Sequence, residues 1–423
     1  MEIRFTNLGF FRSRFVLILL FCVIGKVQSL AFYCPSSLAN STSFDTSLDT
    51  SNQKDVVDLI ESVFRTHIRK PGDTAQVKPG KLLFAVVPGI GYSLQTNFDV
   101  VTTMNVSFYN GPAKSTNLSA VTLIPEYAPI THQIIVPIAY NVWTLGNTWN
   151  WVGDMRYYKY PNYTYGLGPN SNLNTSDLID YSYIRMYQVI MRHVVSKFYA
   201  GIGYELDYHW DIKPETDVTG FQLYNQNRTA TTSSGWAINL TYDERTNQNN
   251  PGPGFFANLT YRVNQQLLGS DQNWQSLQAE FREYLHPFKN KKAILAFWSW
   301  NCLTFGGNAP YFDLPSTGWD TYSNMARGYI QGRLRGPGLL YLESEYRFNI
   351  LRSGLLGGVV FVNAQSVAKW PNPNGLQFTN VLPGEGVGLR FKLNKLSNVN
   401  FSLDYGMGTQ GSNGFFLNIA EVF

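Results

Sequence analysis

The last part of this chain alternates apolar and polar side chains with a period of two residues. Within 339–351, Leu340, Leu342 and Tyr346 would share one face of a strand, while the face opposite would carry Glu343 and Glu345. The same alternation recurs in 387–394, 399–405 and 415–423. A soluble sheet would bury the apolar face, whereas a transmembrane barrel would turn it to lipid and its charges to the lumen. Alternation alone predicts antiparallel strands and leaves these two environments open.

The amino-terminal segment and the composition favour the membrane. Arg4, Arg12 and Arg14 precede an apolar run over 15–25 and small residues near 27–29, which predicts a signal peptide in 1–29. No other stretch approaches the roughly 20 apolar residues of a transmembrane helix, so a membrane protein of this sequence must cross as strands. Only 15% of residues are charged, against about 25% in ordinary soluble domains. We therefore predict an all-β fold, a transmembrane antiparallel β-barrel, in 80–423.

Between the signal and the barrel, 30–79 is expected to form a periplasmic tether with a short amphipathic helix. Residues 35–52 are rich in Ser, Thr, Asn and Asp, and apolar residues at helical spacing follow Asp55. Such a helix could plug the periplasmic mouth, pack beside the barrel or dock on a partner, and capping of the barrel end is favoured. The apolar positions are Val56, Val57, Leu59, Ile60, Val63 and Phe64.

Strand-length runs separated by Gly, Pro, Asn and Ser fill the rest of the chain. An even strand number suits a barrel with both termini on the periplasmic side, and the runs predict about 16 strands. They begin near positions 81, 97, 117, 132, 148, 180, 197, 233, 254, 273, 291, 338, 354, 383, 399 and 412.

The expected lumen face carries charges of both signs. They could form ion-pair ladders that stiffen the barrel or line a water-filled pore, and the alternation does not separate these interpretations. They are Glu205, Asp207, His209 and Asp211 on one strand, Asp243 and Arg245 on another, and Glu280 and Arg282 on a third.

Composition and motifs argue against several other classes. A net charge of +4 over 423 residues gives no basis for nucleic-acid binding. The three cysteines include Cys22 in the predicted signal, so a disulfide framework is not expected. The sequence contains no Gly-x-Ser-x-Gly, His-Glu-x-x-His or phosphate-loop motif. We predict no enzymatic activity, no cofactor and no metal site.

One connection, between about 305 and 338, is far longer than a hairpin needs. Loops beyond about 15 residues are usually functional. This one contains Arg327, Gly328 and Tyr329. A guanidinium in a confined lumen requires carboxylate partners, and Glu343 and Glu345 on the next strand would face inward. Gly328 would let the loop backbone approach the wall closely.

This loop resembles that of the BamA/TamA superfamily of outer-membrane assembly and secretion barrels, also called bacterial surface antigens. In that family a long extracellular loop carrying an Arg-Gly-aromatic motif folds back into the lumen, and Arg327, Gly328 and Tyr329 match the motif. Glu345 resembles the family's acidic position after the loop. Asn363 stands where the family has an acid in the following strand, so its expected contact with Arg327 would be weaker. The resemblance also includes 88–92, 386–390 and 403–406.

The carboxyl-terminal strand extends the resemblance. Phe415, Leu417, Ile419 and Phe423 are expected on one apolar face, with Phe423 similar to the family's signal for delivery to the assembly machinery.

The resemblance implies a barrel in the outer membrane of a Gram-negative bacterium, in contact with outer-membrane lipids. It further implies an accessory role in outer-membrane protein assembly or translocation, with the loop latched by Arg327. The segment 30–79 is too short for the soluble periplasmic repeats of family members, so protein partners are expected to supply periplasmic function. A gated or passive solute channel and a structural scaffold for a surface protein complex are the alternatives.

Overall fold

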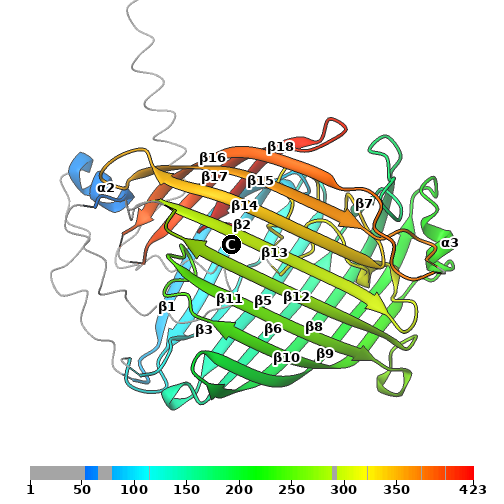
Figure 1. The fold of residues 1–423 in the computed structure, drawn as a ribbon, viewed down its shortest axis with the longest axis horizontal. Coiled ribbons are helices and arrows are strands. Elements are labelled where there is room, and N and C mark those ends of the chain that lie inside the picture. Colours follow the sequence, from blue (N-terminus) through cyan, green and yellow to red (C-terminus); the bar gives the residue numbers. More distant parts are fainter. Residues whose placement is uncertain are drawn as a thin grey trace, which may run out of the picture.

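The computed structural model describes residues 53–64, 79–113, 115–287, 293–321, 323–372, 374–395 and 397–423. Its main body is an antiparallel sheet that curves into a barrel, with helix α2 (Val56–Phe64) at one end and helix α3 (Phe221–Asn225) at the other (Figure 1). No helix in these ranges is long and apolar enough to cross a membrane. The predicted signal peptide lies outside the described residues.

The strands follow one another along the chain. They are β1 (Leu83–Ser93), β2 (Asn97–Phe108), β3 (Ser119–Leu123), β4 (Glu126–Ala128), β5 (Gln133–Trp143), β6 (Trp149–Lys159), β7 (Asn162–Thr164), β8 (Asp177–Val195), β9 (Phe198–Pro214), β10 (Thr231–Asp243), β11 (Gly254–Asn264), β12 (Trp274–Leu285), β13 (Ile294–Phe305), β14 (Gly338–Asn349), β15 (Leu356–Val367), β16 (Leu382–Asn394), β17 (Val399–Met407) and β18 (Asn413–Ile419). Short 3-10 turns are η1 (Leu145–Asn147), η2 (Gln266–Leu268) and η3 (Tyr311–Asp313).

Neighbours in sequence pair antiparallel throughout the described sheet. β3 and β4 both lie between β2 and β5, and β6 and β7 both pair with β8. The 18 segments therefore occupy 16 positions around the sheet. All 16 strand starts expected from the sequence lie within three residues of an observed start. The predicted antiparallel barrel is confirmed.

The two ends of the sheet approach each other without a ladder. β1 pairs with β2 over its whole length, from Leu83 opposite Ser107 to Ser93 opposite Asn97. Its other edge lies near β18, and Leu94 occupies the space beside Gly414. Among the described residues, no backbone register joins β1 to β18. This seam is the least paired part of the wall.

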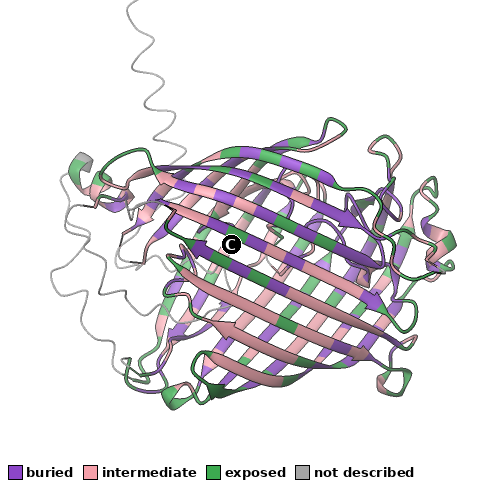
Figure 2. Cartoon of the chain, in the orientation of Figure 1, coloured by how far each residue is buried: buried purple, intermediate pink, exposed green. Residues whose placement is uncertain are grey.

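Burial alternates along each strand as the sequence predicts (Figure 2). On β14, Leu342 is 59% exposed, whereas Glu343 and Glu345 are almost completely buried. The expected lumen position of Asp211 is wrong. A register irregularity opposite 180–182 and a positive φ at Asp211 shift the alternation, so its side chain is exposed.

Helix α2 docks on turns at one end of the barrel. Asp55 and Asp58 bond each other's backbone N–H groups at 2.9 Å, which caps the helix start. The Lys395 N–H, just after β16, donates to Asp55 at 2.8 Å, and its ammonium contacts Asp58 at 2.8 Å. Lys54 N–H also donates to the Ser353 carbonyl at 3.0 Å. The start of the helix therefore packs against the turns that follow β14 and β16.

Candidate functional site in the barrel lumen

The long connection between β13 and β14 folds into the barrel and holds its own shape. Thr317 N–H donates to the Leu334 carbonyl at 2.9 Å, and Gly332 N–H donates to the Thr317 carbonyl at 2.8 Å. The Thr317 hydroxyl bonds Gln365 on β15 at 2.7 Å. Ser316, Thr317 and Leu334 are fully buried. The loop is thus an ordered insertion fixed to the inner wall.

Arg327 lies at the centre of this insertion and is 1% exposed. Its guanidinium bonds Glu343 and Glu345 on β14, and also Asp404 on β17 at 2.5 Å. The guanidinium carbon lies 3.7 Å above the centre of the Phe361 ring. A planar, delocalised cation suits both the carboxylates and the ring face. The loop thereby connects β14 with β17, which are not neighbours in the sheet.

The residues around Arg327 bring the loop backbone against the wall. Gly328 has φ +106°, and a Cβ there would meet Met407 at 2.8 Å, so glycine is required. The Tyr329 hydroxyl donates to the Pro383 carbonyl at 2.5 Å and accepts from Thr409 N–H at 2.9 Å. Tyr329 thus anchors the loop to β16 and to the turn between β17 and β18.

Asn363 contacts Arg327 in a different way from the one expected. Its Nδ2 donates to the Arg327 carbonyl at 3.0 Å, whereas the guanidinium is directed to carboxylates. An amide can donate a hydrogen bond that a carboxylate could not. Asn363 therefore supports the loop backbone and not the charge.

The acids that bind Arg327 continue into a larger network. Glu345 accepts from Arg347 Nε at 2.6 Å, and Asp404 pairs with Arg390. Glu421 contacts Arg390 at 2.7 Å and Arg347 at 3.7 Å. These contacts close a ring of alternating charge, which we call the charge ring. Its members are Arg327, Glu345, Arg347, Glu421, Arg390 and Asp404.

After β18 the chain turns into the lumen. Ala420 has φ +92°, and Phe423, which is 2% exposed, stacks on Trp298 with ring centres 5.2 Å apart. Phe415 and Ile419 remain on the outer face, 50% and 40% exposed. The expectation that Phe423 shares their face is wrong, because the turn at Ala420 ends the alternation.

The inward-turned residues also contact the loop and the charge ring. Arg347 donates to the main-chain oxygen of Phe423 at 3.0 Å. Asn324, in the loop, donates to the Val422 carbonyl at 2.9 Å and accepts from Asn418 at 2.9 Å. The segment 420–423, which we call the inward turn, is therefore bound to the same network as Arg327.

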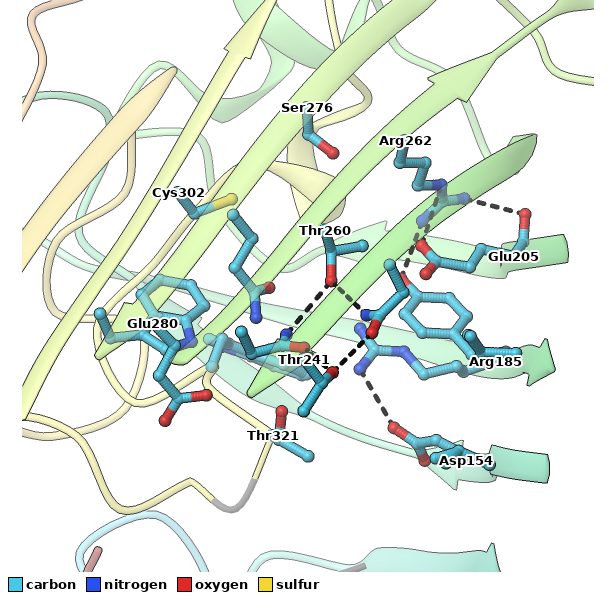
Figure 3. A pocket seen from close by; sticks show the side chains of 18 of the residues that line it. Asp154, Arg185, Glu205, Thr241, Thr260, Arg262, Ser276, Glu280, Cys302 and Thr321 are labelled. Atoms are coloured by element: carbon cyan, nitrogen blue, oxygen red, sulfur yellow. Dashed lines mark hydrogen bonds and ion pairs between the residues drawn. The ribbon is translucent and has the colours of Figure 1, made fainter. Parts of the chain in front are cut away.

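A polar cavity of about 290 Å³ lies in the lumen, lined mainly by β6 and β8 to β13 (Figure 3). Its charged side chains are matched: Arg262 contacts Asp207 at 2.6 Å, and Arg185 contacts Asp207 at 3.2 Å and Asp154 at 3.6 Å. Glu280 pairs with Arg282 on its own strand. Most of the predicted lumen charges thus form ion pairs around a polar cavity.

The loop covers one side of this cavity with aromatic and acidic residues. Phe312 stacks on Tyr181 of β8 at 4.1 Å between ring centres. Asp313 accepts from the Ser233 hydroxyl at 2.5 Å. Burial, followed by repulsion from Asp207, raises the pKa of Asp313 to about 7. In the described ranges, no group of three or more His, Cys, Asp or Glu is arranged to hold a metal.

Comparison with known proteins identifies the family. A model of the Omp85 superfamily domain matches residues 137–423. The chain belongs to the Omp85 superfamily. The predicted family is confirmed, and with it the outer membrane of Gram-negative bacteria as the location of this Omp85 barrel.

Solved structures share the Omp85 fold at low sequence identity. BamA from Haemophilus ducreyi lacking POTRA domains 1-3 is 15% identical with a TM-score of 0.54, covering 80% of this chain and 69% of that one. CdiB from Acinetobacter baumannii is 13% identical with a TM-score of 0.52, covering 80% and 60%. CdiB from Escherichia coli is 9% identical with a TM-score of 0.54, covering 83% and 66%. A search among curated proteins finds no significant match.

The sequence indicated two of the three acids around Arg327 in this Omp85 barrel. Asp404 was missed, as were Arg347, Arg390 and Glu421. Asp404 and Arg390 lie on the polar faces of alternating strands, so the sequence does indicate that they point inward. Their proximity to Arg327 depends on the curvature of the sheet and the path of the loop, which alternation does not contain.

Proposed function

We propose that this Omp85 barrel assists the insertion or translocation of polypeptides at the outer membrane, with the loop held by Arg327 in the resting state. The observation that carries the proposal is the link between the Arg327 loop and the seam. The charge ring joins the loop to Glu421, directly beyond β18. A structural change at the seam would therefore alter the contacts of the loop, and movement of the loop would alter the seam.

The seam supplies a surface that a client strand could use. β18 has seven residues, and its outer edge lacks a described ladder to β1. An unpaired strand edge presents N–H and C=O groups that bind another extended segment. In a membrane these groups must be satisfied, so a nascent strand is favoured there over lipid.

The solute-channel alternative requires a continuous water-filled path through the barrel, and the loop obstructs such a path. The loop is packed into the lumen, and Phe312 is stacked on the wall. Conductance in planar bilayers tests this. The proposal expects little steady conductance from the wild-type protein and more from Arg327→Ala. A large steady wild-type pore would favour the channel.

A crosslinking experiment tests the assembly role directly. Photoreactive residues placed at Ile90 on β1 and at Ile190 on β8 are matched probes, since both side chains face outward and are 59% and 50% exposed. During outer-membrane protein synthesis, the proposal expects crosslinks to polypeptides from Ile90 and not from Ile190. Equal yields, or none from Ile90, would contradict it.

Protein partners belong to the same proposal. Helix α2 lies at the end of the barrel where the β14–β15 and β16–β17 turns emerge, and Leu59 is 47% exposed. A partner supplying periplasmic function would contact this end. Native purification followed by identification of stoichiometric companions tests this, and a partner bound at the opposite loops would favour the scaffold alternative.

A further inference from the structure

A small polar patch interrupts the lipid-facing wall on β13 and β14. Trp300 and Cys302 line the lumen cavity, and Cys302 is drawn there in Figure 3. Because successive strand residues point to opposite faces, Ser299 and Asn301 face outward. Ser344 on β14 lies diagonally across from Ser299, since its register partner is Phe297.

This patch lies within the apolar belt and not at its rim. The exposed residues Phe297 and Phe305 lie on the same outward face, one on each side of Asn301 along β13. The register partners of Asn301 are Ala279 on β12 and Leu340 on β14. These neighbours offer the carboxamide no side-chain hydrogen bond.

A carboxamide facing hydrocarbon carries two donors and an acceptor that lipid tails do not satisfy. Asn301 Nδ2 donates to Ser299 Oγ at 2.8 Å. Among the described residues, the Asn301 side chain makes no other hydrogen bond. The Asn301 carboxamide therefore keeps one N–H and its oxygen for a bond to a neighbouring protein.

We propose that Ser299, Asn301 and Ser344 form a contact between two copies of this barrel within the membrane. Copies inserted in the same direction and related by a two-fold axis along the membrane normal place each residue at the depth of its equivalent. Asn301 then meets Asn301. A carboxamide is both donor and acceptor, so the pair is self-complementary, and such bonds between polar side chains stabilise contacts in lipid. The small side chain of Ala279 beside it permits close approach.

Cysteine crosslinking in native outer membranes tests the contact. Leu303→Cys reports on the proposed face, and Leu389→Cys, an outward position on β16, is the matched control. Both are made in a background in which the native cysteines are serine. We expect a disulfide-linked dimer from Leu303→Cys and none from Leu389→Cys.

Substitution of the amide supplies the second arm. Asn301→Leu should lower the Leu303→Cys dimer yield at least fivefold, whereas Asn301→Gln, which keeps a carboxamide, should retain most of it. Heat-modifiable migration on gels verifies that each variant is folded, and if Asn301→Leu is not, the two cysteine positions alone decide. Equal yields at 303 and 389, an unchanged yield in folded Asn301→Leu, or a crosslink to a different protein would overturn the proposal.

Discussion

At the scale of single residues, Arg327 is the cation that keeps a cluster of acids compatible with burial. Glu343, Glu345 and Asp404 surround it, and all three are at most 1% exposed. Their attraction to Arg327 offsets the cost of removing the charges from water. Removal of one partner from such a cluster leaves a buried charge without compensation.

Arg327→Ala should therefore release the loop. Breaking a buried pair typically costs about 3–5 kcal/mol, so we expect faster proteolysis of the loop and a lower temperature for loss of the heat-modifiable form. Arg327→Lys should be intermediate, since an ammonium lacks the planar fork. Arg228→Ala, which removes a partly exposed arginine 3.6 Å from Asp271, is the control. Equal sensitivity of the Arg327 and Arg228 variants would contradict the assigned role.

Asp313 should make loop docking depend on pH. Its pKa is raised to about 7 in the folded protein, from an ordinary value of about 3.9. A raised carboxyl pKa stabilises the docked loop at low pH, and this contribution is lost as the pH rises through about 7. Loop proteolysis should accelerate as the pH rises from about 4 to about 7 and change little above that.

The amide variant separates Asp313 from other titrating groups. Asp313→Asn should remove most of this pH dependence, because the amide resembles the protonated acid in charge. Asp271→Asn, in the β11–β12 loop, should retain the wild-type profile. A profile that is the same in Asp313→Asn and wild type would exclude Asp313 as the cause.

At the scale of elements, the Phe423 ring and the Glu421 carboxylate are two of the groups that hold the inward turn in the lumen. Phe423→Ala removes the ring from Trp298, and comparable core truncations cost about 3–5 kcal/mol. Glu421→Gln removes the charge that faces Arg390 and Arg347. Each variant should raise the mobility of a spin label at 422, with no comparable change for Phe415→Ala, whose ring faces outward. Immobile labels in both inward-turn variants would contradict this prediction.

The elements also show what the sequence contained. Strand starts were predictable because alternation and turn residues are local signals. The exposed Asp211 was not, because a bulge adds a residue without a distinctive sequence mark. The direction of Phe423 was also missed, since it depends on a positive φ at Ala420 and on Trp298, which is distant in sequence. For Arg327, the sequence predicted the two acidic partners on the next strand. The contact with Asp404 could not be predicted, because it depends on the three-dimensional arrangement of the loop and the sheet.

At the scale of the whole molecule, the outer surface is adapted to lipid. Leu342, Ile202 and Val387 are 59%, 69% and 57% exposed on different strands. Leu342→Arg should destabilise insertion into bilayers by about 2–4 kcal/mol, as expected for a cation near the midplane. Leu267→Arg, in a loop where the side chain is 91% exposed, should have almost no effect. Urea titration of folding in lipid vesicles measures both, and equal effects would contradict the proposed belt.

The turn at Ala420 has a geometric consequence for the size of the barrel opening. Residues 420–423 now occupy the interior, and β18 stops at Ile419. If this peptide swung outward and became extended, its four residues would add about 13 Å of new hydrogen-bonding border, at about 3.3 Å per residue. Withdrawal of Phe423 would at the same time empty a volume beside Trp298. Rotation of the chain at Ala420 would thus lengthen the hydrogen-bonding border of β18 and, at the same time, enlarge the space inside the barrel.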